Sequence, residues 1–172
     1  MQYGWSTMTS TVEQRLAALG LSLPERCDPR GNFLPFERAG DLVFMAGQIC
    51  EWNGEVPYTG PVRAADLEAG DGEASISLEE GRKAAELCAL NLLFHLRTAC
   101  SGDLDRVVSV VRVGGFVNCR FGFDKSPAAI NGASDLFIAV FGDAGRHART
   151  AVGVAGLPAN ASVEVDAVFK VR

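Results

Sequence analysis

The stretch SVEVDAVFKVR, Ser162–Arg172, alternates apolar and charged residues with a period of two. A β-strand with one buried face has this pattern, because successive side chains point to opposite faces of a sheet. The apolar face runs from Val163 to Val171, and the other face carries Glu164 and Asp166. The sequence therefore predicts a half-buried strand here.

Further stretches have the composition of strands. Asp41–Ile49 (DLVFMAGQI) is a continuous apolar run, which predicts a buried strand. Asp105–Val113 is rich in β-branched residues, and Ala148–Ala155 precedes a turn. Residues 51–75 hold many glycine, proline and acidic residues, so we expect an extended loop with a short strand around Val56–Tyr58. A loop of this length is typical of a lid or a subunit contact.

A long helix is predicted from Ser77 to about Cys100. Ser77 and Glu80 have the spacing of a capping box, in which each residue bonds the other's backbone N–H. From Ala84 onward the stretch is apolar nearly all round. We therefore expect a sheet and a neighbouring subunit to cover it.

Two more helices are predicted. Val12–Leu19 has apolar residues at helical spacing, with Gly20 behind them. A second main helix is expected to have Ser126 as its N-cap and Pro127 at its first position, and to end at Gly142. The order strands, helix, strand, helix, strand, strand predicts an α+β fold with a mixed sheet and both main helices on one face.

Length and composition limit the class of protein. With 172 residues, 48% of them hydrophobic, one domain can bury its core without a disulfide or metal. We expect a single domain over residues 11–172, with residues 1–10 as a disordered segment or an extension. The net charge of −5 and the lack of a Lys/Arg cluster disfavour nucleic-acid binding. No apolar run reaches the roughly 18 residues of a membrane span.

The cysteines and histidines do not have the spacing of a zinc site. The chain has five cysteines, with no C-x-x-C pair, and only two histidines. We therefore expect free thiols in a reducing cytoplasm, and neither a metal nor a cofactor.

A candidate site depends on how the last two strands pair. If they form a symmetric hairpin, Ala151 faces Glu164 and Arg149 faces Asp166. Arg149 and Glu164 then share one face as diagonal neighbours about 7–8 Å apart. One interpretation is a solvated cross-strand ion pair. The other is a binding site in which the guanidinium binds a ligand carboxylate and the glutamate orients a water.

The C-terminal motif supports the second interpretation. The stretch ARTAVGVAGLP, Ala148–Pro158, followed by VEVDA at Val163–Ala167, resembles the C-terminal signature of the Rid (YjgF-like) family, also called endoribonuclease L-PSP. FMAGQI at 44–49 and AING at 129–132 resemble two further family segments. The resemblance covers roughly residues 33–172.

This resemblance implies a chorismate-mutase-like fold and a homotrimer with a central barrel-like core, whose ligand clefts lie between subunits. The RidA members hydrolyse reactive 2-iminoacids to 2-ketoacids and ammonia. Such chemistry needs mostly positioning and a modest proton transfer, because an imine carbon is already electrophilic. A small carboxylate-bearing ligand and other copies of the chain are therefore the expected partners, with no membrane or nucleic acid.

The resemblance also assigns roles to residues. Arg149 matches the arginine that binds the substrate carboxylate, and Glu164 matches the glutamate that assists the water; both are the candidate catalytic residues. Gly47 and Ala151 line the cleft with their backbone. We add two further substrate-binding candidates, Asn131 and Phe36.

Departures from RidA indicate a divergent subgroup. Phe36 stands where the family has a tyrosine, Ala46 replaces a serine, and Ala151 replaces a cysteine. The pocket is therefore more apolar than in RidA. A non-catalytic small-molecule binding or sensing trimer remains the alternative to imine hydrolysis, and the acidic composition argues against a ribonuclease. His147, two residues before Arg149, is a further candidate for the cleft.

Overall fold

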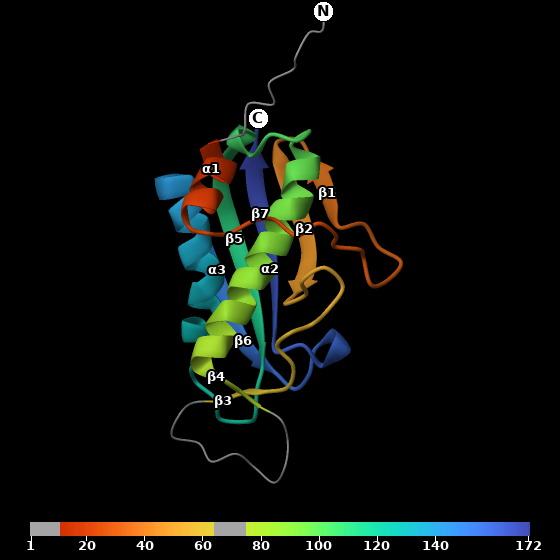
Figure 1. Ribbon diagram of the computed structural model, residues 1–172, viewed down its shortest axis with the longest axis vertical. Coiled ribbons are helices and arrows are strands. Elements are labelled where there is room, and N and C mark those ends of the chain that lie inside the picture. Colours follow the sequence, from red (N-terminus) through yellow and green to blue (C-terminus); the bar gives the residue numbers. More distant parts are fainter. Residues whose placement is uncertain (1–10, 64–74) are drawn as a thin grey trace, which may run out of the picture.

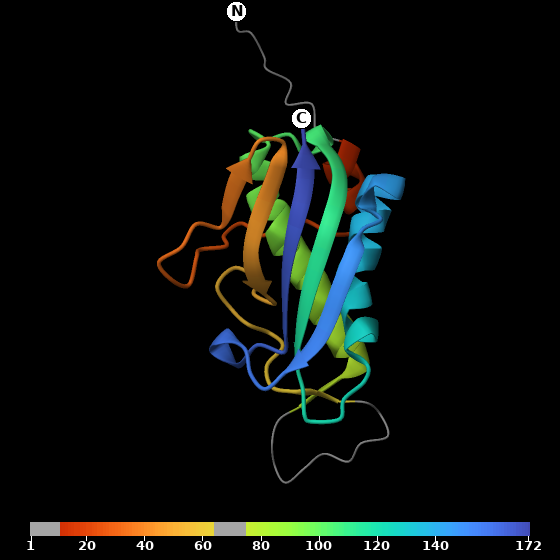
Figure 2. The ribbon, with the colours of Figure 1, turned by 180° about the vertical axis from the view of Figure 1, so that it is seen from behind.

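The computed structural model describes residues 11–63 and 75–172. It contains a five-stranded sheet with the order β1-β2-β7-β5-β6 (Figure 1). These strands are β1 (Phe36–Ala39), β2 (Leu42–Ile49), β5 (Val107–Asn118), β6 (Ala148–Val154) and β7 (Val163–Val171). Neighbouring strands are antiparallel, except that β6 runs parallel to β5. Figure 2 shows this sheet from its uncovered side.

The C-terminal strand β7 lies in the middle of the sheet and has the predicted alternation. Val163, Val165, Ala167, Phe169 and Val171 are all buried. Glu164 and Asp166 therefore project from the opposite face. The central position of β7 explains why its apolar face is continuous.

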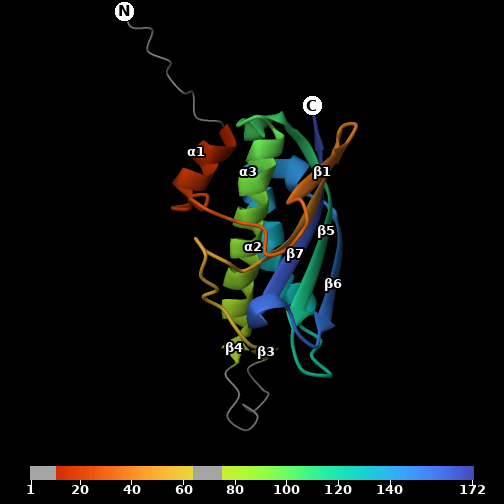
Figure 3. The same cartoon turned by 90° about the vertical axis from the view of Figure 1, so that its right-hand side faces the viewer.

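Two helices, α2 (Leu78–Ala99) and α3 (Ser126–Phe141), cover one face of the sheet and leave the other open (Figure 3). The short helix α1 (Thr11–Ala18) packs against α3. The core between helices and sheet includes Phe137 and Phe169, whose rings meet edge to face at 5.6 Å. The predicted α+β class, with both main helices on one face, is confirmed.

Helix α2 begins at the predicted capping box. The Ser77 hydroxyl accepts from the backbone N–H of Glu80 at 3.2 Å, and the Glu80 carboxylate accepts from the backbone N–H of Ser77 at 2.7 Å. Leu90 of this helix is 2% exposed, and it lines a surface pocket together with Leu21 and Trp52 of the same chain. The expected cover by a neighbouring subunit stays a prediction.

Helix α3 differs from the prediction at its first residue. Lys125, not Ser126, is the N-cap, while Pro127 lies in the first turn and Gly142 ends the helix with a φ of 65°. Gly132 lies where α3 packs tightly against α2, since a Cβ there would collide with the backbone carbonyl of Arg82. Close packing of the two helices therefore requires glycine at this position.

The loop predicted at residues 51–75 differs from the prediction in where its strand residues lie. No strand forms around Val56–Tyr58, where Pro57 has no N–H to donate to a ladder. Instead β3 (Val62–Arg63) pairs in parallel with β4 (Ile76–Ser77). The remaining expectations for this loop, at 64–74, and those for residues 1–10 lie outside the described residues.

The predicted hairpin between the last two strands is wrong. Strand β5 lies between β6 and β7, so Arg149 pairs with Val113, whereas Glu164 pairs with Phe116 and Ile49. Strands that follow one another in sequence often pair. Here, however, α3 connects β5 to β6, so β6 lies parallel to β5, on the side of β5 away from β7. The single-face arrangement of Arg149, Glu164 and Asp166 therefore does not exist within one chain.

Two findings concern the composition. Over the described ranges, no helix is long and apolar enough to cross a membrane. All five cysteines are free thiols, four of them buried and Cys119 half-buried.

Candidate functional site

Arg149 lies on edge strand β6, on the helix-covered side of the sheet. Its register partner Val113 is fully buried beneath the helices, and paired residues of parallel strands point to the same face. Its Nη1 donates to Asn131 Oδ1 at 2.8 Å and to Ser134 Oγ at 3.0 Å. Within 11–63 and 75–172, Arg149 makes no ion pair, so the Nε and Nη2 edge of the guanidinium can receive a ligand.

Glu164 lies on the opposite face, at the start of β7. Its carboxylate packs directly against Gly47, where a Cβ would collide with a carboxylate oxygen. Burial, and to a smaller extent the neighbouring Asp166, raises the pKa of Glu164 above its ordinary value of 4.5. A half-buried carboxyl with a raised pKa is a stronger base than an exposed one, so it is suited to accept and return a proton.

A cavity of about 440 Å³ opens beside Glu164. It lies along the part of β2 that β1 does not reach, because β1 pairs only with residues 42–45. A bulge between Met45 and Gln48 interrupts the pairing of β2 with β7. The lining comes from β2, β7, α2 and three connecting segments: Cys27, Asp28, Pro29, Arg30, Phe33, Leu34, Ala46, Gly47, Gln48, Ile49, Glu51, Asn91, Pro158 and Glu164.

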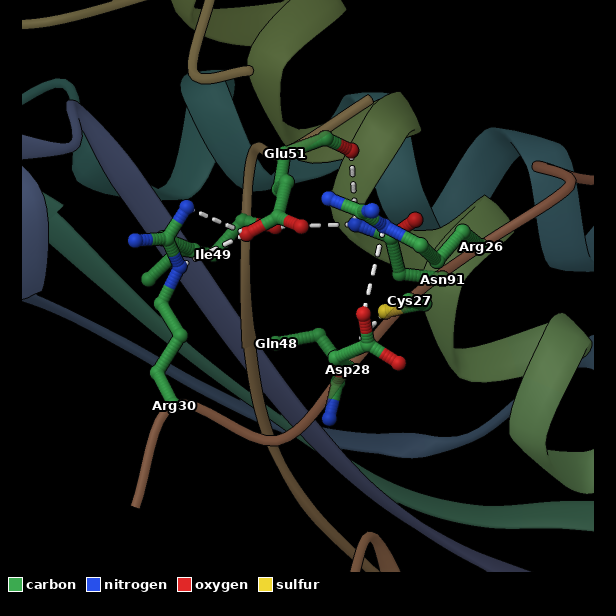
Figure 4. A network of polar contacts seen from close by, with 8 residues as sticks. All are labelled: Arg26, Cys27, Asp28, Arg30, Gln48, Ile49, Glu51 and Asn91. Carbon is green, nitrogen blue, oxygen red and sulfur yellow. Dashed lines mark hydrogen bonds and ion pairs between the residues drawn. The ribbon is translucent and has the colours of Figure 1, made fainter. Parts of the chain in front are cut away.

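A polar network forms one wall of this cavity (Figure 4). Arg30 pairs with Glu51 at 2.6 Å, and the Glu51 side chain is only 9% exposed. Asn91 of α2 donates to the backbone carbonyls of Ile49 at 3.1 Å and Glu51 at 2.8 Å. These bonds fix the chain where it leaves β2 and hold the Arg30 guanidinium at the cavity wall.

Cys27, in the same wall, is a hydrogen-bond donor. Its thiol donates to Gln48 Oε1 at 3.2 Å. Burial, with the nearby Glu51 and Asp28 carboxylates, raises the pKa of Cys27 to about 12. The thiol therefore stays protonated at neutral pH and does not serve as a nucleophile.

Five of the six candidate site residues fall into two separate groups. Glu164 and Gly47 meet in the cavity. Arg149 and Asn131 are hydrogen-bonded on the other face, and Ala151 follows Arg149 on that face of β6. Phe36 pairs with Met45 and packs on the core, outside the cavity lining. We call these groups the Glu164 half-site and the Arg149 half-site.

The sequence analysis missed Arg30, Glu51 and Asn91. One signal was available for Asn91, because it is one of two polar residues, with His95, inside the apolar run LCALNLLFHL. A buried amide needs hydrogen-bond partners, which predicts a polar contact on that side of the helix.

As for metals, the described parts of the chain hold no group of three or more His, Cys, Asp or Glu residues placed to bind an ion.

The mixed sheet with two helices on one face, and a cavity containing a half-buried glutamate, define a small α+β protein with a ligand-sized site. The model of the family described as "YjgF/chorismate_mutase-like, putative endoribonuclease" matches residues 13–169. The chain therefore belongs to the YjgF (Rid) family.

Relatives with similar sequences span nearly its whole length. "Protein TCP17" of Trypanosoma cruzi is 38% identical over 162 residues, 94% of each chain. The structure of Atu1372 from Agrobacterium tumefaciens, titled as of unknown function, is 38% identical with a TM-score of 0.81, covering 94% of this chain and 93% of that one. A "putative endoribonuclease" from Shewanella oneidensis is 32% identical with a TM-score of 0.82, covering 95% of this chain and 100% of that one.

RidA itself is more distant. RidA from an Antarctic Psychrobacter is 20% identical, with a TM-score of 0.52, over 87% of this chain and 94% of that one. That likeness concerns the fold alone. The low identity is consistent with the divergent subgroup that Phe36, Ala46 and Ala151 indicate.

Proposed function

We propose that the protein hydrolyses 2-iminoacids or enamine acids to 2-ketoacids and ammonia, in clefts formed between the subunits of a trimer. The observation that carries this proposal is the separation of the two half-sites. One chain holds an oriented guanidinium on one sheet face and a carboxyl of raised pKa beside a cavity on the other. Neither half-site alone can both bind the substrate carboxylate and activate a water. A second copy of the chain can supply the missing residue to each half-site.

The open sheet face supports contact between copies. Phe44 and Val152 are 46% and 41% exposed, and both alternate with residues that point to the helix side. Apolar side chains on an uncovered sheet face favour a protein partner. A copy that places its β6 edge against this face brings its Arg149 toward the Glu164 half-site, in agreement with the subunit clefts that the family resemblance implies.

The chemistry assigns one task to each half-site. The Nε and Nη2 edge of Arg149 binds the substrate carboxylate with two charge-assisted hydrogen bonds. Glu164 takes a proton from a water, whose oxygen attacks the imine carbon and forms a tetrahedral amino alcohol. Glu164 returns this proton to the nitrogen and then carries the proton of the new hydroxyl to the same nitrogen as the carbon–nitrogen bond breaks, so the hydroxyl becomes the ketone oxygen and ammonia leaves. Water and imine thus give ketoacid and ammonia, with no redox step.

The cavity supports a proposal about the substrate side chain. Its volume of about 440 Å³ is within the range of small-molecule sites and exceeds the need of the smallest iminoacids. Phe33 and Leu34, 48% and 67% exposed, provide apolar surface at this cavity. We therefore infer a substrate with a sizeable, mainly apolar side chain.

The test uses iminoacids generated in situ by an amino-acid oxidase acting on several amino acids. The purified protein should accelerate ketoacid formation over buffer, and Arg149→Ala and Glu164→Gln should each remove that acceleration. Arg146→Ala is a matched control, because Arg146 is an exposed cation three residues before Arg149, and its guanidinium pairs with Asp143. Wild-type protein that accelerates none of the imines would contradict the proposal.

A non-catalytic binding or sensing role is the second candidate. It is favoured by the apolar residues at Phe36 and Ala46, where the family has hydroxyl-bearing side chains. This role predicts that a 2-ketoacid raises the melting temperature of the wild-type protein but not of Arg149→Ala, while no imine is turned over. Turnover by the wild-type protein would reject it.

A further inference from the structure

His147 lies just before β6, and its ring reaches helix α3. Its Nδ1 is 2.7 Å from the backbone carbonyl of Gly145, and its Nε2 is 3.0 Å from Ser134 Oγ. A carbonyl only accepts, so Nδ1 carries the proton of the neutral ring. Nε2 is then an acceptor and takes the hydroxyl proton of Ser134.

The same hydroxyl oxygen accepts a hydrogen bond from Arg149. Arg149 Nη1 donates to Ser134 Oγ at 3.0 Å and to Asn131 Oδ1 at 2.8 Å, which occupies both hydrogens of this nitrogen. The bonds form one directional chain, from Arg149 to Ser134 to His147 to the Gly145 carbonyl. Each hydrogen has one acceptor only while His147 is neutral.

We propose that Ser134 and His147 are positioning residues, which hold the Arg149 guanidinium with its Nε and Nη2 edge free for a ligand carboxylate. The inference rests on the proposed role of Arg149 and goes beyond it by adding a hydrogen-bond relay. Ser134 is 7% exposed and contributes its oxygen as an acceptor, so it acts on Arg149 rather than on substrate.

The surroundings of His147 favour its neutral form. Burial and the Arg149 charge lower the pKa of His147 from its ordinary value of 6.5, against an opposing effect of the Gly145 carbonyl. On α3, Asp135 pairs with Arg82, and the Phe137 ring packs edge-on against the imidazole at 6.2 Å. On the segment before β6, Asp143 and Arg146 pair with each other, and on β5 Arg112, the register partner of Ala148, pairs with Asp166.

Protonation of His147 would break the chain of bonds. Nε2 would become a donor toward Ser134 Oγ, and the hydroxyl proton would lose its acceptor. The protonated His147 ring would also be a second positive charge, separated from the Arg149 guanidinium only by Ser134 Oγ. We therefore expect carboxylate binding to weaken as the pH falls through the lowered pKa of His147.

The experiment measures the dissociation constant of 2-ketobutyrate by calorimetry between pH 8 and pH 5, with kcat and KM for the imine as a second readout. Ser134→Ala should weaken binding and raise KM about tenfold, with little change in kcat, and Ser134→Thr should restore both. His147→Gln keeps an acceptor near the Nε2 position and does not titrate. Its affinity should stay level at acid pH, where that of the wild type falls.

Asp135→Ala, one residue along α3, is the control and should bind like the wild type. Wild-type affinity and pH dependence in both Ser134→Ala and His147→Gln would overturn the relay alone. If the wild-type protein binds no ketoacid, both the relay and the role of Arg149 fail. Binding that depends on the relay without any imine turnover would support the relay and contradict hydrolysis.

Discussion

The two half-sites are built in different ways. The Arg149 half-site lies between a regular helix and a regular strand, where three hydrogen-bonding side chains fix one charge. The Glu164 half-site lies where regularity ends, at a bulge in β2 beside a segment without strand or helix. Regular elements hold a guanidinium in one orientation, whereas irregular backbone leaves room for a ligand and partly desolvates an acid. A cleft between copies would combine the two properties.

The largest effects should separate binding from turnover. Arg149→Ala should raise the dissociation constant of a 2-ketoacid by about 100-fold, because two charge-assisted hydrogen bonds are lost. Glu164→Gln should leave that constant within about threefold and lower kcat by about 100-fold, because the base is removed. Calorimetry and turnover measured on the same samples test this. Equal losses of affinity in both variants would remove the distinction between the half-sites.

Gly47→Ala should disable the Glu164 half-site without touching Arg149. The new Cβ would collide with the Glu164 carboxylate and displace it, so kcat should fall at least about tenfold. Gly156→Ala is the control, since a Cβ there meets nothing within 4 Å. If Gly47→Ala turns over substrate like Gly156→Ala, then Glu164 does not act from its present position.

Arg30→Met should weaken the cavity wall. It leaves the Glu51 carboxylate, 9% exposed, without its cation, and we expect the protein to lose about 1–2 kcal/mol of stability. Urea unfolding measures the change. Adding Glu51→Gln should recover part of the loss, because the uncompensated charge is gone. A double variant less stable than the single one would show that Arg30 stabilises the wall through other contacts.

The smallest effect concerns stability and pH. The pKa of Glu164 is raised in the folded protein, so its ionised form destabilises the fold. This penalty is absent below the ordinary pKa of 4.5 and fully present above the raised one. Glu164→Gln should therefore raise the melting temperature by about 2 °C at pH 8 and by less at pH 4. A larger rise in melting temperature at pH 4 than at pH 8 would contradict a raised pKa of Glu164.

Much of the fold could be predicted because local patterns determine it. The alternation in Ser162–Arg172 and the capping box at Ser77 each depend on a few neighbouring residues. The partner of a strand is not encoded in this way. A period of two shows which residues share a face of β6, but not that β5 lies beside it, so the hairpin prediction failed.

The sequence motif named Arg149, Glu164 and Gly47 as site residues, and the structure brings Glu164 and Gly47 together beside the cavity. The roles of these residues in binding and catalysis stay predictions. Ser134 has the spacing of the apolar stripe of α3, and its role depends on a ring that reaches it from another element. Arg30 lies in a segment without periodicity, so only the folded chain shows its contact with Glu51.

Complementation between inactive variants tests the central claim most directly. Arg149→Ala and Glu164→Gln subunits, each inactive alone, are co-expressed in equal amounts and assayed for imine hydrolysis. If a cleft takes Arg149 from one copy and Glu164 from the next, about a quarter of the clefts in randomly mixed oligomers hold both intact residues. The account predicts that about this fraction of wild-type activity returns. A mixture as inactive as its parents would contradict it.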